Sequence, residues 1–133
     1  MKNFSPRAKE IIGVLAQDEA RKLGSRQLLP EHVILEIIKK QDGLGYMVFE
    51  RLLLDPLELQ KIIEKYFENE SKIPTLEKLP LSHRYQQLLD IAVIESNALE
   101  NDYIGTEHLL LAAIREEGSI TSRFFAAADY NMA

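Results

Sequence analysis

The sequence predicts an all-α protein, in which two tandem copies of a four-helix unit pack as one domain with pseudo-twofold symmetry. Three observations support this prediction. Apolar residues recur at helical spacing along most of the chain, no segment shows a sustained alternation of apolar and polar residues, and the second half repeats the first. We therefore expect helices joined by short loops, and no β-sheet.

Four helices are predicted in the first copy, residues 4–70, and their ranges are 5–23, about 31–41, 46–54 and 56 to about 69. Ser5 is the expected N-cap of the first helix, Pro6 takes its first position, and Gly24 ends it. Asp42-Gly43 breaks the second helix. Asp55-Pro56 supplies a cap and a first position for the fourth.

The second copy, residues 81–133, follows a linker at 71–80 that contains Pro74 and Pro80. Its predicted helices cover 82–100, 106–117 and 120 to about 128. A counterpart of the fourth helix should come next, but the sequence stops at Ala133, so we expect this last helix to be truncated.

The repeat is visible as pairs of matched residues at an almost constant spacing. These pairs include Glu31 with Glu107, His32 with His108 and Phe49 with Phe125 at a spacing of 76, and Ser5 with Ser82 and Arg7 with Arg84 at 77. The change in spacing places one extra residue near the start of the first copy. Because two copies are too few for a solenoid, we expect a single domain over residues 1–133.

The composition indicates an ordinary soluble globular protein, with 46% hydrophobic and 28% charged residues. A net charge of −5 argues against nucleic-acid binding, which needs a basic face. No apolar run is long enough for a membrane span, and the amino terminus lacks a signal-peptide core. The absence of cysteine excludes disulfides and thiolate sites. We therefore expect a cytoplasmic protein with neither a membrane nor a nucleic-acid partner.

Motifs for catalysis are absent from the sequence. There is no phosphate-binding loop of the Gly-x-x-x-x-Gly-Lys-Ser/Thr type, no glycine-rich dinucleotide turn and no Ser–His–Asp or Cys–His order, so no catalytic residue is assigned. His32 and His108 each follow a glutamate, but a zincin motif needs a histidine four residues further on, where Glu36 and Ala112 stand. Packing or contacts at a helix amino terminus explain both histidines better than metal ligation. A metal-dependent hydrolase is a remote alternative.

Four polar residues form the candidate binding site: Ser5, Glu31, Ser82 and Glu107. Each also has a structural explanation, because a glutamate in a first helical turn interacts favourably with the helix dipole and a serine caps a helix. The free N–H groups of a first turn also bind phosphate. A repeated glutamate beside two helix starts could therefore hold a cation and an anion close together.

Three stretches resemble the Clp amino-terminal repeat, and they are Phe4-Ser5-Pro6-Arg7-Ala8-Lys9, Asp18-Glu19-Ala20-Arg21-Lys22-Leu23-Gly24 and Tyr103-Ile104-Gly105-Thr106-Glu107-His108-Leu109-Leu110-Leu111 with Ile114-Arg115-Glu116. The resemblance covers nearly the whole chain and includes the duplication. It is strongest to the ClpC branch, with ClpA and ClpB as neighbours.

The resemblance implies an all-helical domain that precedes two ATPase modules in a hexameric ATP-dependent chaperone or unfoldase. Such a domain captures substrate and adaptor proteins, which the ring unfolds and usually delivers to a ClpP-type protease. ATP and Mg²⁺ would belong to the ATPase modules, so no cofactor is expected in this domain, and the isolated domain should be a monomer. The alternative is a free-standing Clp-repeat protein that acts as an adaptor or assembly subunit and lacks ATPase modules.

In the ClpC branch the resemblance also implies recognition of phosphorylated arginine, with one site per repeat. By motif, the sites fall on Glu31 with Ser5 in the first copy and on Glu107 with Ser82 in the second. Pro30 stands where the second copy has Thr106, and it lacks both a backbone donor and a hydroxyl. We therefore expect the second site to be the stronger.

Overall fold

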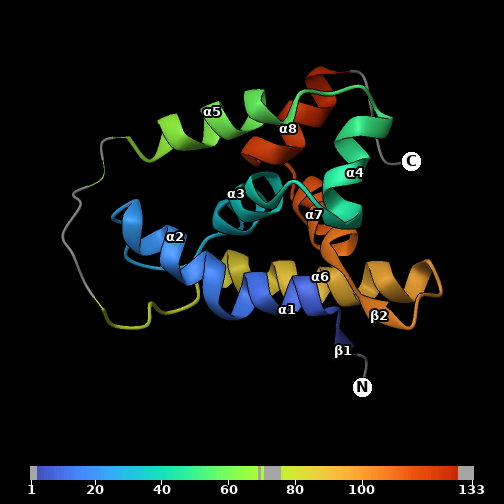
Figure 1. Ribbon diagram of the computed structural model, residues 1–133, viewed down its shortest axis with the longest axis horizontal. Helices are drawn as coiled ribbons and strands as arrows, with labels where there is room; N and C mark the ends of the chain where they lie inside the picture. Colours follow the sequence, from blue (N-terminus) through green and yellow to red (C-terminus); the bar gives the residue numbers. More distant parts are fainter. Residues whose placement is uncertain (1–2, 69, 71–75, 129–133) are drawn as a thin grey trace.

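The computed structural model describes residues 3–68, 70 and 76–128, and it confirms the all-α prediction (Figure 1). The helices in the first part of the chain are α1 Pro6–Glu10, η1 Ile11–Leu15, α2 Ala16–Lys22, α3 Pro30–Lys40, α4 Gly43–Arg51 and α5 Pro56–Tyr66. Those in the second part are α6 His83–Ala98, α7 Thr106–Arg115 and α8 Ile120–Ala127, and the strands are β1 Asn3–Phe4 and β2 Tyr103–Ile104.

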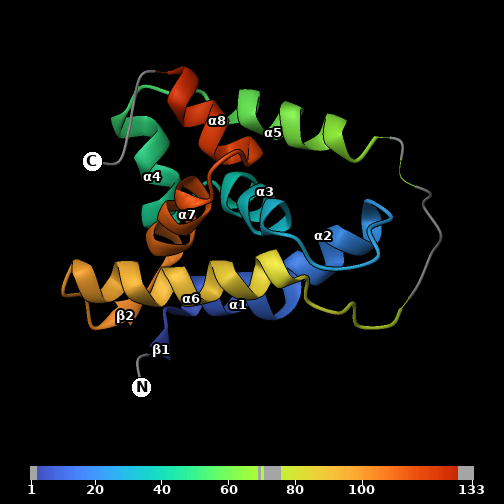
Figure 2. The same cartoon turned by 180° about the vertical axis from the view of Figure 1, so that it is seen from behind.

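Helices α3 and α7 lie at the centre of the molecule. The helices α1, α2 and α6 lie on one side of this pair and α5 and α8 on the other, with α4 against α7 (Figures 1 and 2). All residues of α3 from Pro30 to Ile38 are buried. The two central helices therefore form the core, and their amino termini are where Glu31 and Glu107 lie.

The absence of a sheet was predicted wrongly, because β1 and β2 pair in parallel, with Asn3 opposite Tyr103 and Phe4 opposite Ile104. An isolated parallel bridge joins Leu28 to Leu81. Strands of two residues are too short to show a period-two pattern, so sequence periodicity could not reveal them. Each pairing joins the segment before the first helix of one copy to the segment before the second helix of the other.

A π-helical turn explains the extra residue in the first copy. The first long helix is continuous from Pro6 to Lys22, but η1 interrupts its α-helical pattern at Ile11–Leu15. Its counterpart α6 is a regular α-helix throughout. Single inserted residues are commonly accommodated as one π turn. The change of spacing from 77 to 76 falls at the start of this turn, between Arg7 and Ile12.

Other boundaries differ slightly from the predicted ones. Helix α4 begins at Gly43, three residues earlier than expected, because Gln41 at φ 55° and Asp42 already provide the break after α3. Helix α5 ends at Tyr66. Most of the predicted linker, residues 71–75, and the expected start of a fourth helix in the second copy, residues 129–133, lie outside the described residues.

Two buried carboxyl groups lie side by side between α2 and α3. Glu19 and Glu36 are 5% and 8% exposed, and Lys39 Nζ lies 2.7 Å from Glu19 Oε1. Burial, with the neighbouring Glu19, raises the pKa of Glu36 to about 7. Burial opposes ionisation of Glu19 as well, but Lys39 holds the pKa of Glu19 below its usual value. The second copy keeps the ion pair, as Glu95 with Arg115 at 2.6 Å, and has Ala112 in place of Glu36.

This cluster predicts an unusual pH dependence of stability. Because the folded-state pKa of Glu36 is raised, its contribution to stability is full below about pH 4.5 and is lost as the pH rises through about 7. Burial lowers the pKa of His32 to about 4. The stability that the neutral His32 contributes therefore depends on pH in the opposite direction, and it is lost as the pH falls from about 6.5 toward 4. The other charged groups near the cluster are Lys22 and Glu64, both of which are exposed to solvent for a large part of the side chain.

We expect Glu36→Gln to remove the pH-dependent contribution of Glu36 to stability and to leave that of His32. Urea unfolding at about pH 5 and pH 8 should then show a larger gain of stability with rising pH in this variant than in the parent. Glu64→Gln, which changes an exposed charge near the same lysine, is the control. An unchanged pH dependence in Glu36→Gln would contradict the raised pKa of this carboxyl group.

Candidate functional site

Ser5 and Ser82 cap their helices as predicted. Ser5 Oγ accepts a hydrogen bond from the backbone N–H of Ala8 at 3.2 Å, and Ser82 Oγ accepts one from Tyr85 at 3.0 Å. The remaining N–H groups of each first turn have no intrahelical acceptor. Pro6 carries no N–H, so α1 offers one backbone donor fewer than α6.

The structure groups the four candidate residues differently from the sequence prediction. The backbone N–H of Ser5 donates to Ile104 O at 2.8 Å, three residues before Glu107, and that of Ser82 donates to Leu28 O at 3.0 Å, three residues before Glu31. The serine of each copy thus lies beside the glutamate-bearing helix of the other copy. The within-copy grouping was wrong because the short parallel pairings cross between the copies.

Glu31 is almost completely buried and is already paired. It is 3% exposed, and its Oε2 accepts a hydrogen bond from Arg84 Nη2 at 2.7 Å. Arg84 also donates from Nε and Nη2 to the two oxygens of Glu116, at 2.6 and 2.8 Å. These bonds to Glu116, and the nearby Glu31, raise the pKa of Arg84 despite its burial. The other oxygen of Glu31, Oε1, is buried without a hydrogen-bond partner among the described residues.

Glu107 has a different environment. It is half-buried, and Tyr103 Oη donates to its Oε2 at 2.7 Å, which raises the pKa of Tyr103. No lysine or arginine within the described part of the chain forms an ion pair with it. Arg7, which matches Arg84 in the repeat, pairs with Glu10 and Asp42 instead. The two glutamates therefore share a backbone position but not a partner.

Gly105 allows the conformation of Glu107. A Cβ atom at this position would lie 2.2 Å from Glu107 Oε1 and 2.9 Å from the Tyr103 ring. The residue that matches Gly105 in the first copy is Leu29, and by analogy its Cβ atom would crowd the same side-chain position. The backbone before each helix thus helps to decide where its glutamate points.

The Thr106 hydroxyl is not free to bind a ligand. The expectation of a stronger second site relied partly on this hydroxyl. Its Oγ1 accepts a hydrogen bond from the backbone N–H of Gly45 at 2.8 Å, and the residue is 3% exposed. The hydroxyl therefore ties α4 to α7. Thr106 differs from Pro30 by a hydroxyl and by a backbone N–H. Of these two groups, only the backbone N–H remains as a possible donor to a ligand.

The two histidines make contacts at helix amino termini, as predicted. His32 Nδ1 accepts from the backbone N–H of Leu29 at 2.9 Å, and His108 Nδ1 accepts from Gly105 at 2.8 Å. Since Nδ1 is an acceptor, Nε2 carries the proton and reaches Ser25 Oγ from His32 and Asn101 Oδ1 from His108. Within residues 3–68, 70 and 76–128, no three histidine, aspartate or glutamate side chains are placed to hold a metal ion.

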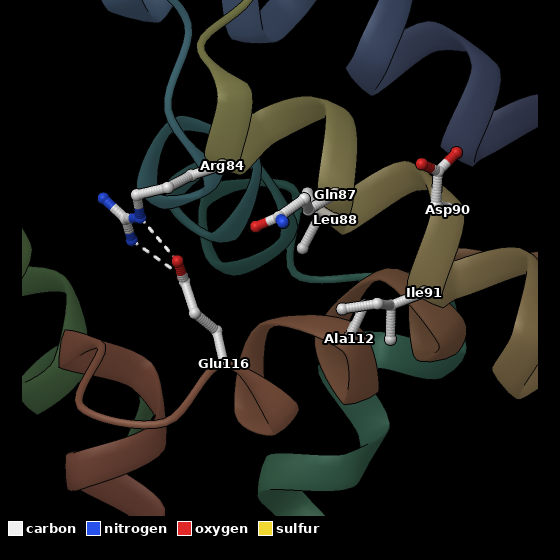
Figure 3. Close-up of a pocket in the computed structure, with 7 residues that line it drawn as sticks. All are labelled: Arg84, Gln87, Leu88, Asp90, Ile91, Ala112 and Glu116. Atoms are coloured by element: carbon white, nitrogen blue, oxygen red, sulfur yellow. Dashed lines mark hydrogen bonds and ion pairs between the residues drawn. The ribbon is translucent and has the colours of Figure 1, made fainter.

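Two cavities meet at the ion pair between Arg84 and Glu116. One, of about 250 Å³, lies between α6 and the end of α7, and Figure 3 shows the two side chains reaching toward each other beside it. The other, of about 290 Å³, is lined by Glu31, Arg84 and Glu116 together with Tyr66, Ser119 and Arg123, among others. The candidate site in the first copy is therefore a polar cavity with a buried carboxylate in its wall.

Arg84 and Glu116 were not among the residues that sequence reasoning selected. The match of Arg84 with Arg7 at the repeat spacing was the one available signal, and it did not distinguish their different partners. None of the described helices is long and apolar enough to span a membrane.

Residues 3–128 match the family described as the Clp repeat (R) N-terminal domain. The chain is 29% identical over 121 residues to the negative regulator of genetic competence ClpC/MecB of Bacillus subtilis, and 29% identical over 130 residues to the ATP-dependent Clp protease ATP-binding subunit ClpC of Staphylococcus aureus. It is 32% identical over 120 residues to a ClpA homologue of Cyanidium caldarium. These matches cover 90%, 97% and 90% of this chain but only 14%, 15% and 14% of the relatives.

Solved structures show the same fold. The N-terminal domain of Hsp104 from Candida albicans aligns with a TM-score of 0.76 at 21% identity, covering 98% of this chain and 84% of that one. The N-terminal domain of ClpD from Arabidopsis thaliana aligns with a TM-score of 0.68 at 20% identity, covering 97% and 89%. The chain thus belongs to the Clp repeat N-terminal domain family.

Proposed function

We propose that this chain is the client- and adaptor-binding module of a Clp-type ATP-dependent unfoldase and has no catalytic role of its own. The sequence lacks a phosphate-binding loop, and the chain spans about one seventh of relatives that are named as chaperones or ATP-binding subunits. In the full-length protein, a hexameric ring would deliver bound clients to a ClpP-type protease. ATP and Mg²⁺ would act only in that larger assembly.

The observation that carries this proposal is the placement of two carboxylates beside the starts of two other helices. Glu31 lies near the start of α6 and Glu107 near the start of α1, each linked there by a short parallel pairing. A carboxylate pairs with a guanidinium group, while first-turn N–H groups bind phosphate. We therefore propose phosphoarginine on client proteins as the ligand.

Calorimetry with free phosphoarginine tests the proposal. A hydrogen bond to a charged group contributes roughly 1.5–3 kcal/mol, so the double variant Glu31→Ala/Glu107→Ala should bind at least about tenfold more weakly than the parent. Glu50→Ala removes an exposed carboxylate outside the cavities described above and serves as the control for net charge. If the double variant binds like the parent, the two glutamates only interact with helix dipoles and the proposed site is wrong.

A further inference from the structure

Arg84 presents to Glu31 the same group that a client arginine would present. Its Nη2 lies 2.7 Å from Glu31 Oε2, a normal distance for a charge-assisted hydrogen bond. The guanidinium position beside this glutamate is thus filled by a residue of the chain itself. This bears directly on the proposed function, on which the inference rests.

Two carboxylates hold Arg84 in this position. Glu116 accepts two hydrogen bonds from it, in the fork geometry that makes arginine–carboxylate pairs strong, and Glu31 accepts a third. An incoming arginine would have to compete with a tethered group, whose effective concentration is far higher than that of a free ligand. It would also leave the Arg84 side chain without Glu31 as a partner.

The sequence around Arg7 explains why Arg7 does not pair with Glu107 in the way that Arg84 pairs with Glu31. Arg7 is drawn to Glu10 and Asp42. Their matched positions in the second copy are Gln87, at a spacing of 77, and Gly118, at 76, and neither is acidic. Neither matched position therefore supplies a carboxylate that could draw Arg84 away from Glu31.

Glu116, which accepts two hydrogen bonds from Arg84, is replaced by a residue of opposite charge in the other copy. Glu116 matches Lys40 at a spacing of 76, and a lysine there repels an arginine rather than holding it. Lys40 Nζ instead lies 3.9 Å from Glu10. The different charges at these matched positions are consistent with Arg84 pairing with Glu31 while Arg7 pairs elsewhere.

We propose that Arg84 acts as an intramolecular occupant of the Glu31 site, so that the Glu107 site is the one open to a client arginine or phosphoarginine. The Glu31 site binds only when Arg84 is displaced. The module would then present one ready site and one closed site in each chain, in place of two equal sites.

Calorimetric titration of phosphoarginine into the parent and into Arg84→Gln tests this directly. We expect one binding event in the parent, weakened at least about tenfold by Glu107→Ala and little changed by Glu31→Ala. Arg84→Gln should gain a second event, which the added change Glu31→Ala removes. Arg7→Gln is the matched control in the other copy and should gain none. A single, unchanged event in Arg84→Gln, or equal losses in the two glutamate variants of the parent, would overturn the inference.

A second measurement needs no variant that could misfold. The side-chain Nε–H of Arg84, protected by Glu116, should give its own signal in ¹⁵N NMR spectra of the parent. We expect the chemical shift of this signal to stay unchanged at phosphoarginine concentrations that saturate the Glu107 site. Movement of this signal with the same affinity would show that the ligand enters beside Glu31 at once, and would contradict the inference while leaving the proposed function intact. No binding by the parent or any variant would instead overturn the proposed function and the inference with it.

Discussion

Replacing Phe49 with alanine is expected to destabilise the whole domain by about 3–5 kcal/mol, the usual range for a fully buried aromatic side chain. Phe49 on α4 is completely buried, and its ring lies 5.5 Å from that of Phe125 on α8. These two residues match each other at the repeat spacing, so the contact joins equivalent points of the two copies. Its loss leaves a cavity at the place where the copies meet.

Thermal unfolding followed by circular dichroism measures this effect, with Phe124→Ala as the control. Phe124 is adjacent in sequence but only partly buried, so its replacement should cost clearly less. We expect both variants to unfold in one transition, because each copy alone is too small to be more than marginally stable. The midpoint temperature should be lower for Phe49→Ala than for Phe124→Ala. Two separate transitions, assigned to the two halves by truncation, would contradict packing as one cooperative unit.

Replacing Gly45 with alanine should be the second most damaging change. A Cβ atom there would lie 2.8 Å from the carbonyl oxygen of Thr106 and 2.9 Å from its carbonyl carbon. Backbone atoms cannot move aside as a flexible side chain can, so α4 would be forced away from α7. Overpacking of this kind typically costs 1–3 kcal/mol, and we expect about 3 kcal/mol because the Gly45–Thr106 hydrogen bond is disturbed as well.

Gly13→Ala is the matched control for this change. Gly13 lies in η1, and nothing is within 4 Å of a Cβ atom built on it. Since alanine is favoured over glycine inside a helix by roughly 0.5–1 kcal/mol, this variant should be slightly more stable than the parent. Urea unfolding of both variants gives the comparison. A Gly45→Ala variant as stable as Gly13→Ala would show that α4 does not pack as described.

Much of the fold could be predicted from local signals. Ser5 and Ser82 cap their helices as expected, and the matched residue pairs predicted a duplication from the sequence alone. These features depend on a few neighbouring residues or on a constant spacing. The two-residue strands and the π turn could not be seen, because neither leaves a periodic pattern in so short a segment.

The four candidate residues stay a prediction, and the sequence did not indicate how the fold arranges them. The sequence selected both glutamates and both serines, yet their grouping across copies depends on the pairings of Phe4 with Ile104 and Leu28 with Leu81. Arg84 was missed for the same reason. Its partner Glu31 is 53 residues away in the sequence, and only the folded chain brings them together.

Glu31 and Glu107 differ in their hydrogen-bond partners, although the repeat places them at matched positions. Two positions that match in the repeat have different electrostatic environments, because Glu31 forms an ion pair with a guanidinium group whereas Glu107 accepts a hydrogen bond from a phenol. On the proposed function, we expect substitutions that change the charge at Glu116, Lys40 or Asp42 to alter phosphoarginine binding without changing either glutamate.

An NMR titration of the ¹⁵N-labelled protein with phosphoarginine tests the central claim most directly. If the glutamates and the facing helix starts recognise this group, the amide signals that move first will be those at the starts of α1 and α7, including Arg7, Ala8, Thr106 and Glu107. Free arginine and inorganic phosphate, titrated separately, should each cause weaker shifts of part of this set. Shifts confined to another surface, such as the cavity lined by Ile62, Phe124 and Ala127, or equal shifts with phosphate alone, would contradict the account.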